Sequence, residues 1–306
     1  MSSLFVEDAG VRRLDCGGRV LRLDRPRVVG IVNVTPDSFS DGGDHADTGA
    51  AVAHGLKLLA EGADMLDIGG ESTRPDAADV DVDEELRRVV PVLRGLAAQC
   101  DAPLSVDTSK PAVMRAAVEA GAGLINDVRA LREDGALDAA AALKVPVCLM
   151  HMQGAPRGMQ SAPAYDDVVG EVHRFLAERV FACEMAGMDK RQLLVDPGFG
   201  FGKTLEHNLE LLRHTERFVD LAAGVYVGLS RKSMIGALTG RETPVERMAG
   251  SVAAALIAVQ RGAMIVRTHD VAATVDALAV WRAVHAGDRS PRAERRDAAP
   301  RWPDDE

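Results

Sequence analysis

The sequence predicts an α/β protein built as a single-domain (β/α)8 barrel. Between residues 28 and 287, short apolar runs alternate about eight times with Ala-, Leu- and Val-rich stretches of helical periodicity. The runs are apolar throughout, as are the strands of a parallel sheet that is covered on both faces. About eight such repeats favour a closed barrel over a doubly wound sheet of about five or six strands, which periodicity alone leaves possible.

Each predicted strand is a continuous apolar run that stops at a polar or glycine-rich turn. In chain order, we expect strands at 28–34, 64–70, 103–108, 123–128, 145–152, 192–198, 224–230 and 263–270. Helical periodicity follows each run, which predicts helices at 48–62, 82–99, 110–121, 137–144, 168–187, 204–218, 243–262 and 271–286. The helix at 137–144 has the weakest pattern of the set.

The two ends of the chain differ from this repeat. Residues 1–27 form an N-terminal segment in which Gly17-Gly18 separates two short alternating stretches, and this predicts a β-hairpin that caps the bottom of the barrel. Residues 28–287 form the barrel domain. Residues 288–306 are rich in charge, proline and alanine without an apolar face, so we expect a disordered tail.

The overall composition restricts the class of protein. It is 47% hydrophobic and 27% charged, which is ordinary for a soluble globular chain, and a net charge of −10 argues against a nucleic-acid partner. The four cysteines lie far apart without a CxxC pair, which favours a reducing cytoplasm over a disulfide or zinc framework. We expect no signal peptide and no membrane span.

Polar groups follow nearly every predicted strand. They are Asn33, the GGESTRP stretch (69–75), Asp107, Asn126, His151, Asp196, the SRKS stretch from Ser230, and Arg267 with His269. In a barrel, these strand ends meet at one face and form the active site. A lone Asp or Asn at a strand end is more often a turn-initiating or helix-capping residue than a site residue, so the inference depends on their number and on the barrel.

Familiar motifs of other enzyme classes are absent from the sequence. PGFGFGKT resembles a phosphate-binding loop but has Pro197 where the pattern requires glycine, and GLSRK has Lys232 at the second glycine of GxSxG. Asp67 and His151 have the residue types of a catalytic triad, but no nucleophile motif accompanies them.

The remaining groups suit two chemistries. The set Asp107, Asn126, Asp196 and Lys232 combines acceptors and a donor, as recognition of a flat heterocycle requires. A second set, Arg74, Arg267 and His269, suits a phosphate-like anion. Ser72, Thr73 and Asn33 are candidates for neutral contacts or metal ligation, and a diphosphate commonly recruits Mg²⁺. Lys232 and Arg267 also have the alternative of forming surface ion pairs.

Eight ordered segments of the chain resemble dihydropteroate synthase. They are NVTPDSFSDGG, GGESTRP, VDTSKPAV, IND, MHMQG, DPGFGFGK, GLSRKS and RTHDV, and they extend across residues 28–287. The resemblance implies a TIM barrel of folate biosynthesis. Such an enzyme condenses 4-aminobenzoate with 6-hydroxymethyl-7,8-dihydropterin diphosphate and releases diphosphate. It also implies a homodimer, and a pocket that takes sulfonamides.

The same resemblance assigns roles to individual residues. It implies that the pterin is bound by Asp107, Asn126, Asp196 and Lys232, and the diphosphate by Asn33, Thr73, Arg74, Arg267 and His269. The residues that it places around 4-aminobenzoate are Phe39, Thr73, Pro75, Phe201 and Ser233. Asn33 is the implied Mg²⁺ ligand. The catalytic residues are expected to be Asp107, Lys232, Arg267 and His269.

The resemblance also implies a dissociative reaction, in which diphosphate leaves before the arylamine attacks. The loops 35–49 and 71–82 are expected to close over the site and exclude water. Two other functions remain to be weighed. One is a pterin-dependent methyltransferase domain, which would lack a diphosphate site, and the other is a non-catalytic paralogue that binds pterin.

Overall fold

The predicted barrel is present, closed by pairing of its first strand with its last. The computed structural model describes residues 11–35, 43–72, 79–154, 159 and 163–285. The strands are parallel and follow each other around the barrel in chain order, with β10 paired to β3. They are β3 (Arg27–Asn33), β4 (Met65–Gly69), β5 (Leu104–Asp107), β6 (Leu124–Asp127), β7 (Val147–Met150), β8 (Leu193–Asp196), β9 (Gly224–Gly228) and β10 (Ala263–Thr268). This order excludes the doubly wound sheet.

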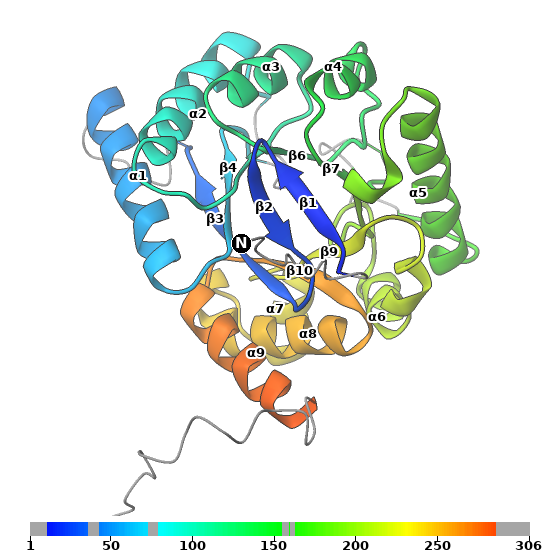
Figure 1. Ribbon diagram of the computed structural model, residues 1–306. Coiled ribbons are helices and arrows are strands. Elements are labelled where there is room, and N and C mark those ends of the chain that lie inside the picture. Colours follow the sequence, from blue (N-terminus) through cyan, green and yellow to red (C-terminus); the bar gives the residue numbers. More distant parts are fainter. Residues whose placement is uncertain (1–10, 36–42, 73–78, 155–158, 160–162, 286–306) are drawn as a thin grey trace, which may run out of the picture.

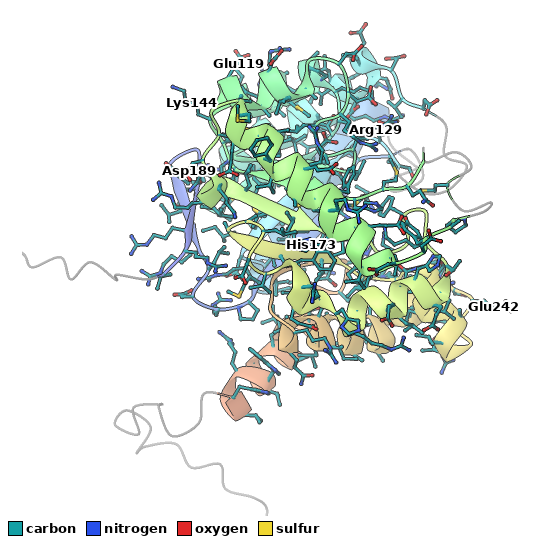
Figure 2. All side chains as sticks on the ribbon, turned by 90° about the vertical axis from the view of Figure 1, so that its right-hand side faces the viewer. Glu119, Arg129, Lys144, His173, Asp189 and Glu242 are labelled. Atoms are coloured by element: carbon teal, nitrogen blue, oxygen red, sulfur yellow. The ribbon has the colours of Figure 1, made fainter. Side chains whose placement is uncertain are left out.

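Helices surround the barrel, one or two after each strand (Figure 1). They are α1 (Gly43–Ala60), α2 (Val82–Ala97), α3 (Pro111–Glu119), α4 (Ala136–Leu143), α5 (Val168–Met185), α6 (Leu205–Arg213), α7 (Ser233–Thr239), α8 (Met248–Gln260) and α9 (Val271–His285). Charged side chains such as Glu119, Asp189 and Glu242 lie exposed on the outside of this ring (Figure 2). Among the described residues, no helix is both long enough and apolar enough to cross a membrane.

Two predicted helices differ from the structure. The segment expected as one helix at 204–218 is divided into α6 and a 3-10 turn at Thr215–Phe218. The segment 243–262 likewise begins with a 3-10 turn, Pro244–Arg247, before α8. The short helix α7 had no predicted counterpart, because it has only seven residues and ends at Gly240 in the left-handed region, too short for a periodic pattern.

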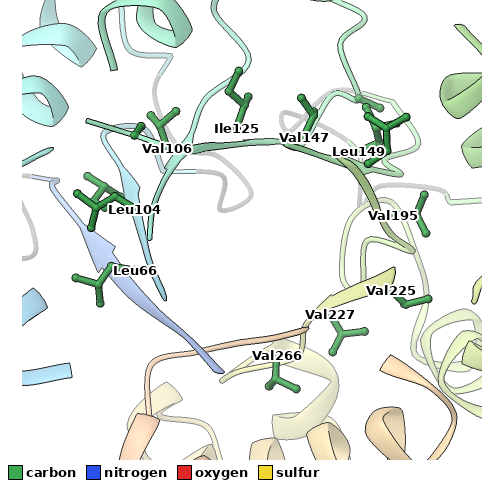
Figure 3. Packing of buried hydrophobic residues seen from close by; sticks show 14 of the residues in the cluster. Leu66, Leu104, Val106, Ile125, Val147, Leu149, Val195, Val225, Val227 and Val266 are labelled. Carbon is green, nitrogen blue, oxygen red and sulfur yellow. The ribbon is translucent and has the colours of Figure 1, made fainter. Parts of the chain in front are cut away.

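The main core lies between the barrel and the helices. Strand residues such as Leu66, Val147 and Val227 point away from the barrel axis (Figure 3) and are fully buried against the helices. Because successive side chains of a strand point to opposite faces, their neighbours in the sequence face the barrel interior. The outer faces therefore form the main core. The inner faces carry a second apolar cluster where the strands begin, which leaves their carboxyl ends for a site.

The N-terminal hairpin is formed as predicted. Strands β1 (Arg13–Cys16) and β2 (Arg19–Arg22) pair in antiparallel fashion across Gly17 and Gly18, which both have positive φ. Their buried side chains pack on the residues that begin the barrel strands. The contact is so close that a Cβ on Gly123 would lie 2.1 Å from the carbonyl oxygen of Cys16. The hairpin thus covers the end of the barrel opposite the strand carboxyl ends.

Candidate active site

Polar side chains line the barrel interior at the carboxyl ends of the strands. Their sequence neighbours, such as Val32, Val106 and Val266, belong to the outer core, so the polar residues face inward. The inward set consists of Asn33, Asp67, Asp107, Asn126, Asp196 and Arg267. Parallel register brings Asp107 level with Asn126. The barrel therefore gathers at one end residues that are far apart in the sequence.

Arg267 is held by two interior carboxylates. Its Nε donates to Asp67 Oδ2 at 2.6 Å, and its Nη2 donates to Asp107 Oδ2 at 3.1 Å. Asn126 Nδ2 donates to the same Asp67 oxygen at 3.1 Å, so its amide oxygen is left to accept from a ligand. Burial disfavours the guanidinium, but the carboxylates of Asp67 and Asp107 outweigh this effect and raise the pKa of Arg267. Arg267 is an interior cation here rather than a surface ion-pair partner.

Asp67 is a site residue that the sequence analysis did not select. It is fully buried, and it links Arg267, expected at the anion, to Asn126, expected at the heterocycle. The available signal was a lone carboxylate inside the apolar run MLDIG, which is costly to bury without a partner. Its partner lies about 200 residues away in the sequence, and only the closed barrel identifies it.

The ionisable groups of the interior have strongly shifted pKa values. Burial, opposed by Arg267 and reinforced by Asp67, raises the pKa of Asp107 to about 7. Burial also raises the pKa of Asp196 to about 6, although the Gly198 N–H and nearby cations oppose it. Burial lowers the pKa of Lys232 to about 8, against the attraction of Asp196. These groups are therefore able to exchange protons near neutral pH, which is typical of a functional site.

Lys232 and Phe201 meet at the opening of the barrel. Lys232 is the extended residue that directly precedes α7, and its Nζ lies 4.1 Å from the centre of the Phe201 ring. Phe201 is buried, whereas Ser233 next to Lys232 is exposed at the start of α7. A cation above an aromatic ring, close to the carboxylate of Asp196, forms a surface on which a flat ligand can bind.

The loop after β8 is organised around Lys203, a residue that the sequence analysis did not assign. Its buried Nζ donates to the carbonyl oxygens of Gly198 at 2.8 Å and Phe201 at 3.0 Å, and it lies 3.0 Å from His151 Nδ1. His151 was a candidate on the strand-end list, but burial and Lys203 lower its pKa to about 2. Gly198 has positive φ, and a Cβ there would lie 1.8 Å from the carbonyl oxygen of His151. His151 therefore supports the loop rather than a ligand.

His269 lies at the edge of the site, after β10. Its Nδ1 is 2.9 Å from Ser230 Oγ, and its backbone N–H donates to the same oxygen at 3.1 Å. Burial together with Arg267 and Arg231 lowers the pKa of His269 to about 3, so its ring is neutral. Within the described residues its Nε2 has no hydrogen-bond partner and is free for a ligand.

Asn33 is the described candidate for metal ligation. It ends β3, is partly buried, and faces the barrel interior opposite Val32. In the described part of the chain, no three His, Cys, Asp or Glu side chains converge as a protein metal centre. One neutral amide oxygen fits an Mg²⁺ ion that takes its other ligands from a diphosphate and water. The remaining predicted residues, Phe39, Thr73, Arg74 and Pro75, lie outside the described residues.

Comparison with known proteins agrees with this geometry. Residues 29–269 match the family model described as pterin binding enzyme. The chain is 51% identical to the dihydropteroate synthase of Escherichia coli K12 over 282 residues, which are 92% of this chain and 100% of that protein.

Solved structures of similar proteins have the same fold. One is the Xanthomonas albilineans dihydropteroate synthase with 4-aminobenzoic acid, at 68% identity and a TM-score of 0.86, over 90% of this chain and 99% of that one. The same synthase in complex with 7,8-dihydropteroate gives 66% identity and a TM-score of 0.83, with the same coverage. A Yersinia pestis dihydropteroate synthase bound to a sulfonamide drug is 51% identical, with a TM-score of 0.85 over 90% of this chain and 99% of that one.

Proposed function

The chain belongs to the family of pterin-binding enzymes, and from this membership we propose that it catalyses the dihydropteroate synthase reaction. It transfers the pterin-methyl group of 6-hydroxymethyl-7,8-dihydropterin diphosphate to the amine of 4-aminobenzoate, forming 7,8-dihydropteroate and diphosphate. The observation that best supports this is the pairing of a heterocycle-binding set with an anion-binding set around Arg267. Relatives solved with 4-aminobenzoic acid and with 7,8-dihydropteroate support the same substrates.

The pterin ring binds inside the barrel mouth. Carboxylates of Asp196 and Asp107 accept from ring N–H and amino groups, and the Asn126 oxygen accepts likewise because its nitrogen is already bonded to Asp67. The ammonium of Lys232 donates to ring acceptors. The distribution of donors and acceptors supports recognition of a heterocycle that has both on its edge.

The diphosphate binds next to the pterin, where the positive groups converge. Arg267 retains Nη1 after its bonds to the two carboxylates, and His269 offers Nε2. We assign Asn33 as the protein ligand of an Mg²⁺ ion that accompanies the diphosphate, which the position of its amide at the inner end of β3 supports. When bound, that ion neutralises charge on the leaving group. Thr73 and Arg74 complete the set in our proposal.

The 4-aminobenzoate binds over the opening, against Phe201 and Ser233. The backbone of Phe201 is held by Lys203, whose Nζ donates to the Phe201 carbonyl oxygen. The exposed hydroxyl of Ser233 contacts the carboxylate of the substrate. Phe39, Thr73 and Pro75 are assigned to the same pocket from their motifs alone. We expect sulfonamides to compete there, as the drug complex of the Yersinia pestis relative supports.

The reaction follows from the charges around the two substrates. Arg267 and His269 stabilise the negative charge that develops on the departing diphosphate. Asp107 lies beside the pterin and favours the positive charge that builds on it as the carbon–oxygen bond breaks. The amine of 4-aminobenzoate is unprotonated at neutral pH, so it attacks the exocyclic methylene without needing a strong base.

Both alternatives from the sequence are less well supported. A methyltransferase domain would not need Arg267 and His269 at an anion site, and a non-catalytic paralogue that only binds pterin would not need to keep Asn33 with them. Relatives over nearly the full length of the chain are dihydropteroate synthases. The family evidence and the site therefore favour the same reaction.

We also propose a cytoplasmic homodimer. Exposed apolar side chains lie on the adjacent elements α7 to α9 (Figure 1), and they are Leu238, Val245, Met248, Ile257, Val280 and Val284. Exposed apolar side chains on neighbouring helices are typical of a subunit interface. The four free cysteines suit a reducing compartment. Light scattering of the purified protein measures the oligomeric state directly.

The proposed function is tested by diphosphate release from the pterin diphosphate. Release must depend on both 4-aminobenzoate and Mg²⁺, and dihydropteroate must accumulate in equal amount. Lys232→Ala serves as the site control: it should abolish pterin binding while the fold is retained. Absence of aminobenzoate-dependent turnover in folded protein would contradict the proposal.

A further inference from the structure

Ser230 and His269 lie face to face on neighbouring loops. Strands β9 and β10 pair with Gly228 level with Arg267, so the residues two positions beyond this pair, Ser230 and His269, come together. Two contacts join them: Ser230 Oγ lies 2.9 Å from His269 Nδ1 and accepts the His269 backbone N–H at 3.1 Å. The serine therefore contacts both the main chain and the ring of one residue.

The surrounding contacts hold this pair in place. The guanidinium of Arg231, next to Ser230, donates to both carboxylate oxygens of Asp270, next to His269, at 3.1 and 2.6 Å. The Arg231 backbone N–H also donates to Ser251 Oγ at 2.8 Å. An ion pair between the two loops thus keeps the hydroxyl at a constant distance from the imidazole.

The proton of the serine hydroxyl has one available acceptor. Ser230 Oγ already accepts the His269 backbone N–H, and within the described residues Nδ1 is the only acceptor that the hydroxyl reaches. A neutral imidazole has one N–H and one lone pair. If Nδ1 accepts from Ser230, the ring proton must be on Nε2. The opposite tautomer would leave the hydroxyl proton unpaired.

We propose that Ser230 is a positioning residue that holds His269 as the Nε2–H tautomer, so that the outward edge of the ring donates a hydrogen bond to the leaving diphosphate. The inference rests on the proposed function. With the proton on Nδ1, a lone pair would face the oxyanion and repel it. Ser230 thus acts through His269 on the diphosphate half of the reaction, not on 4-aminobenzoate.

The tautomer of His269 can be measured without any turnover. Protein labelled with ¹⁵N at its eight histidines is studied by long-range proton–nitrogen correlation, and the His269 signals are assigned by their loss in His269→Gln. We expect the wild type to show protonated Nε2 and a hydrogen-bonded, unprotonated Nδ1. Ser230→Ala should give a mixture of tautomers, and Ser230→Thr should restore the single form because it keeps the hydroxyl.

Steady-state kinetics test the effect of Ser230 on the reaction. In Ser230→Ala, we expect the KM for the pterin diphosphate to rise about fivefold, as loss of one ordinary hydrogen bond predicts. The KM for 4-aminobenzoate should stay unchanged, and Ser230→Thr should recover the wild-type values. A merely structural serine would change both KM values together and would lower the urea midpoint.

Several results would overturn the inference. A wild-type His269 protonated on Nδ1 would refute it, as would an unchanged tautomer in Ser230→Ala. An equal rise in Ser230→Ala of the KM values for both substrates would also refute it. The nitrogen spectrum shows whether Ser230 sets the tautomer of His269 even if the protein has no aminobenzoate-dependent turnover. Failure of the proposed function can therefore be distinguished from failure of this inference. If Ser230→Ala does not fold, the wild-type spectrum and Ser230→Thr give the answer.

Discussion

Replacement of Lys203 by methionine is expected to loosen the loop that follows β8. The amine of Lys203 is buried, donates to the carbonyl oxygens of Gly198 and Phe201, and lies 3.0 Å from His151 Nδ1. Methionine preserves the length of the side chain but has no donor. The variant therefore leaves these three polar groups, and the His151 carbonyl oxygen at the longer distance of 3.4 Å, without the partner that now joins them.

The size of the effect follows from these contacts and from pH. Three hydrogen bonds at about 1 kcal/mol each predict a loss of about 3 kcal/mol in the free energy of unfolding at pH 8. Burial lowers the pKa of Lys203 to about 7. Below that pH, the Lys203 amine is charged in both states, but only in the folded protein is the charge buried, and this destabilises the folded wild type. The wild type gains stability as pH rises through 7, so the loss in Lys203→Met should be about 1 kcal/mol smaller at pH 6.

Urea unfolding at pH 6 and pH 8 measures both quantities. Lys190→Met is the matched control: Lys190 is exposed, and its substitution should change stability by less than about 0.5 kcal/mol at either pH. Because the Phe201 carbonyl loses its donor, the KM for 4-aminobenzoate should also rise. An unfolding midpoint equal to that of the wild type at pH 8 would refute the reasoning, and a pH-independent difference would refute its electrostatic part.

Three further predictions concern the barrel interior and the hairpin. Asp67→Asn should lower kcat/KM for the pterin substrate about tenfold. A neutral amide binds the Arg267 guanidinium less strongly than a carboxylate does, and a difference of about 1.4 kcal/mol in that interaction corresponds to a factor of about ten. kcat/KM for the same substrate should decline below about pH 7, where Asp107 and then Asp196 gain a proton, and above about pH 8, where Lys232 loses one. Gly123→Ala should destabilise the fold by about 3 kcal/mol in urea, because its Cβ would overlap the Cys16 carbonyl.

Each of these has its own control and contrary result. Asp67→Asn should bind 4-aminobenzoate normally, and an unchanged kcat/KM would show that Asp67 does not support the site. In Asp196→Asn, the acid limb should lose its step near pH 6 and keep the step near pH 7 that Asp107 causes, and persistence of the step near pH 6 would assign it to another group. Gly49→Ala in helix α1 meets no atom within 4 Å, so it should be neutral or stabilising. Equal stability of the two glycine variants would contradict the close contact at Gly123.

Local patterns were enough to identify the barrel. Every observed barrel strand begins and ends within two residues of its predicted run, because strands buried on both faces must be apolar and must stop where a polar turn begins. The hairpin at Gly17-Gly18 was predictable for a similar reason, since a two-residue turn of this kind requires positive φ. The order of the motifs was sufficient to indicate the family.

The partners of the polar residues depended on tertiary structure. Nothing local links Asp67 to Arg267, or Ser230 to His269, because the contacts form only when the barrel brings distant strand ends to one edge. Lys203 shows the same limit: once a phosphate-binding loop was rejected because of Pro197, nothing local indicated a role for it, whereas its surroundings make it a buried link between two loops. The sequence specifies which chemical groups are present, and the closed barrel determines which of them share a proton, a charge or a ligand.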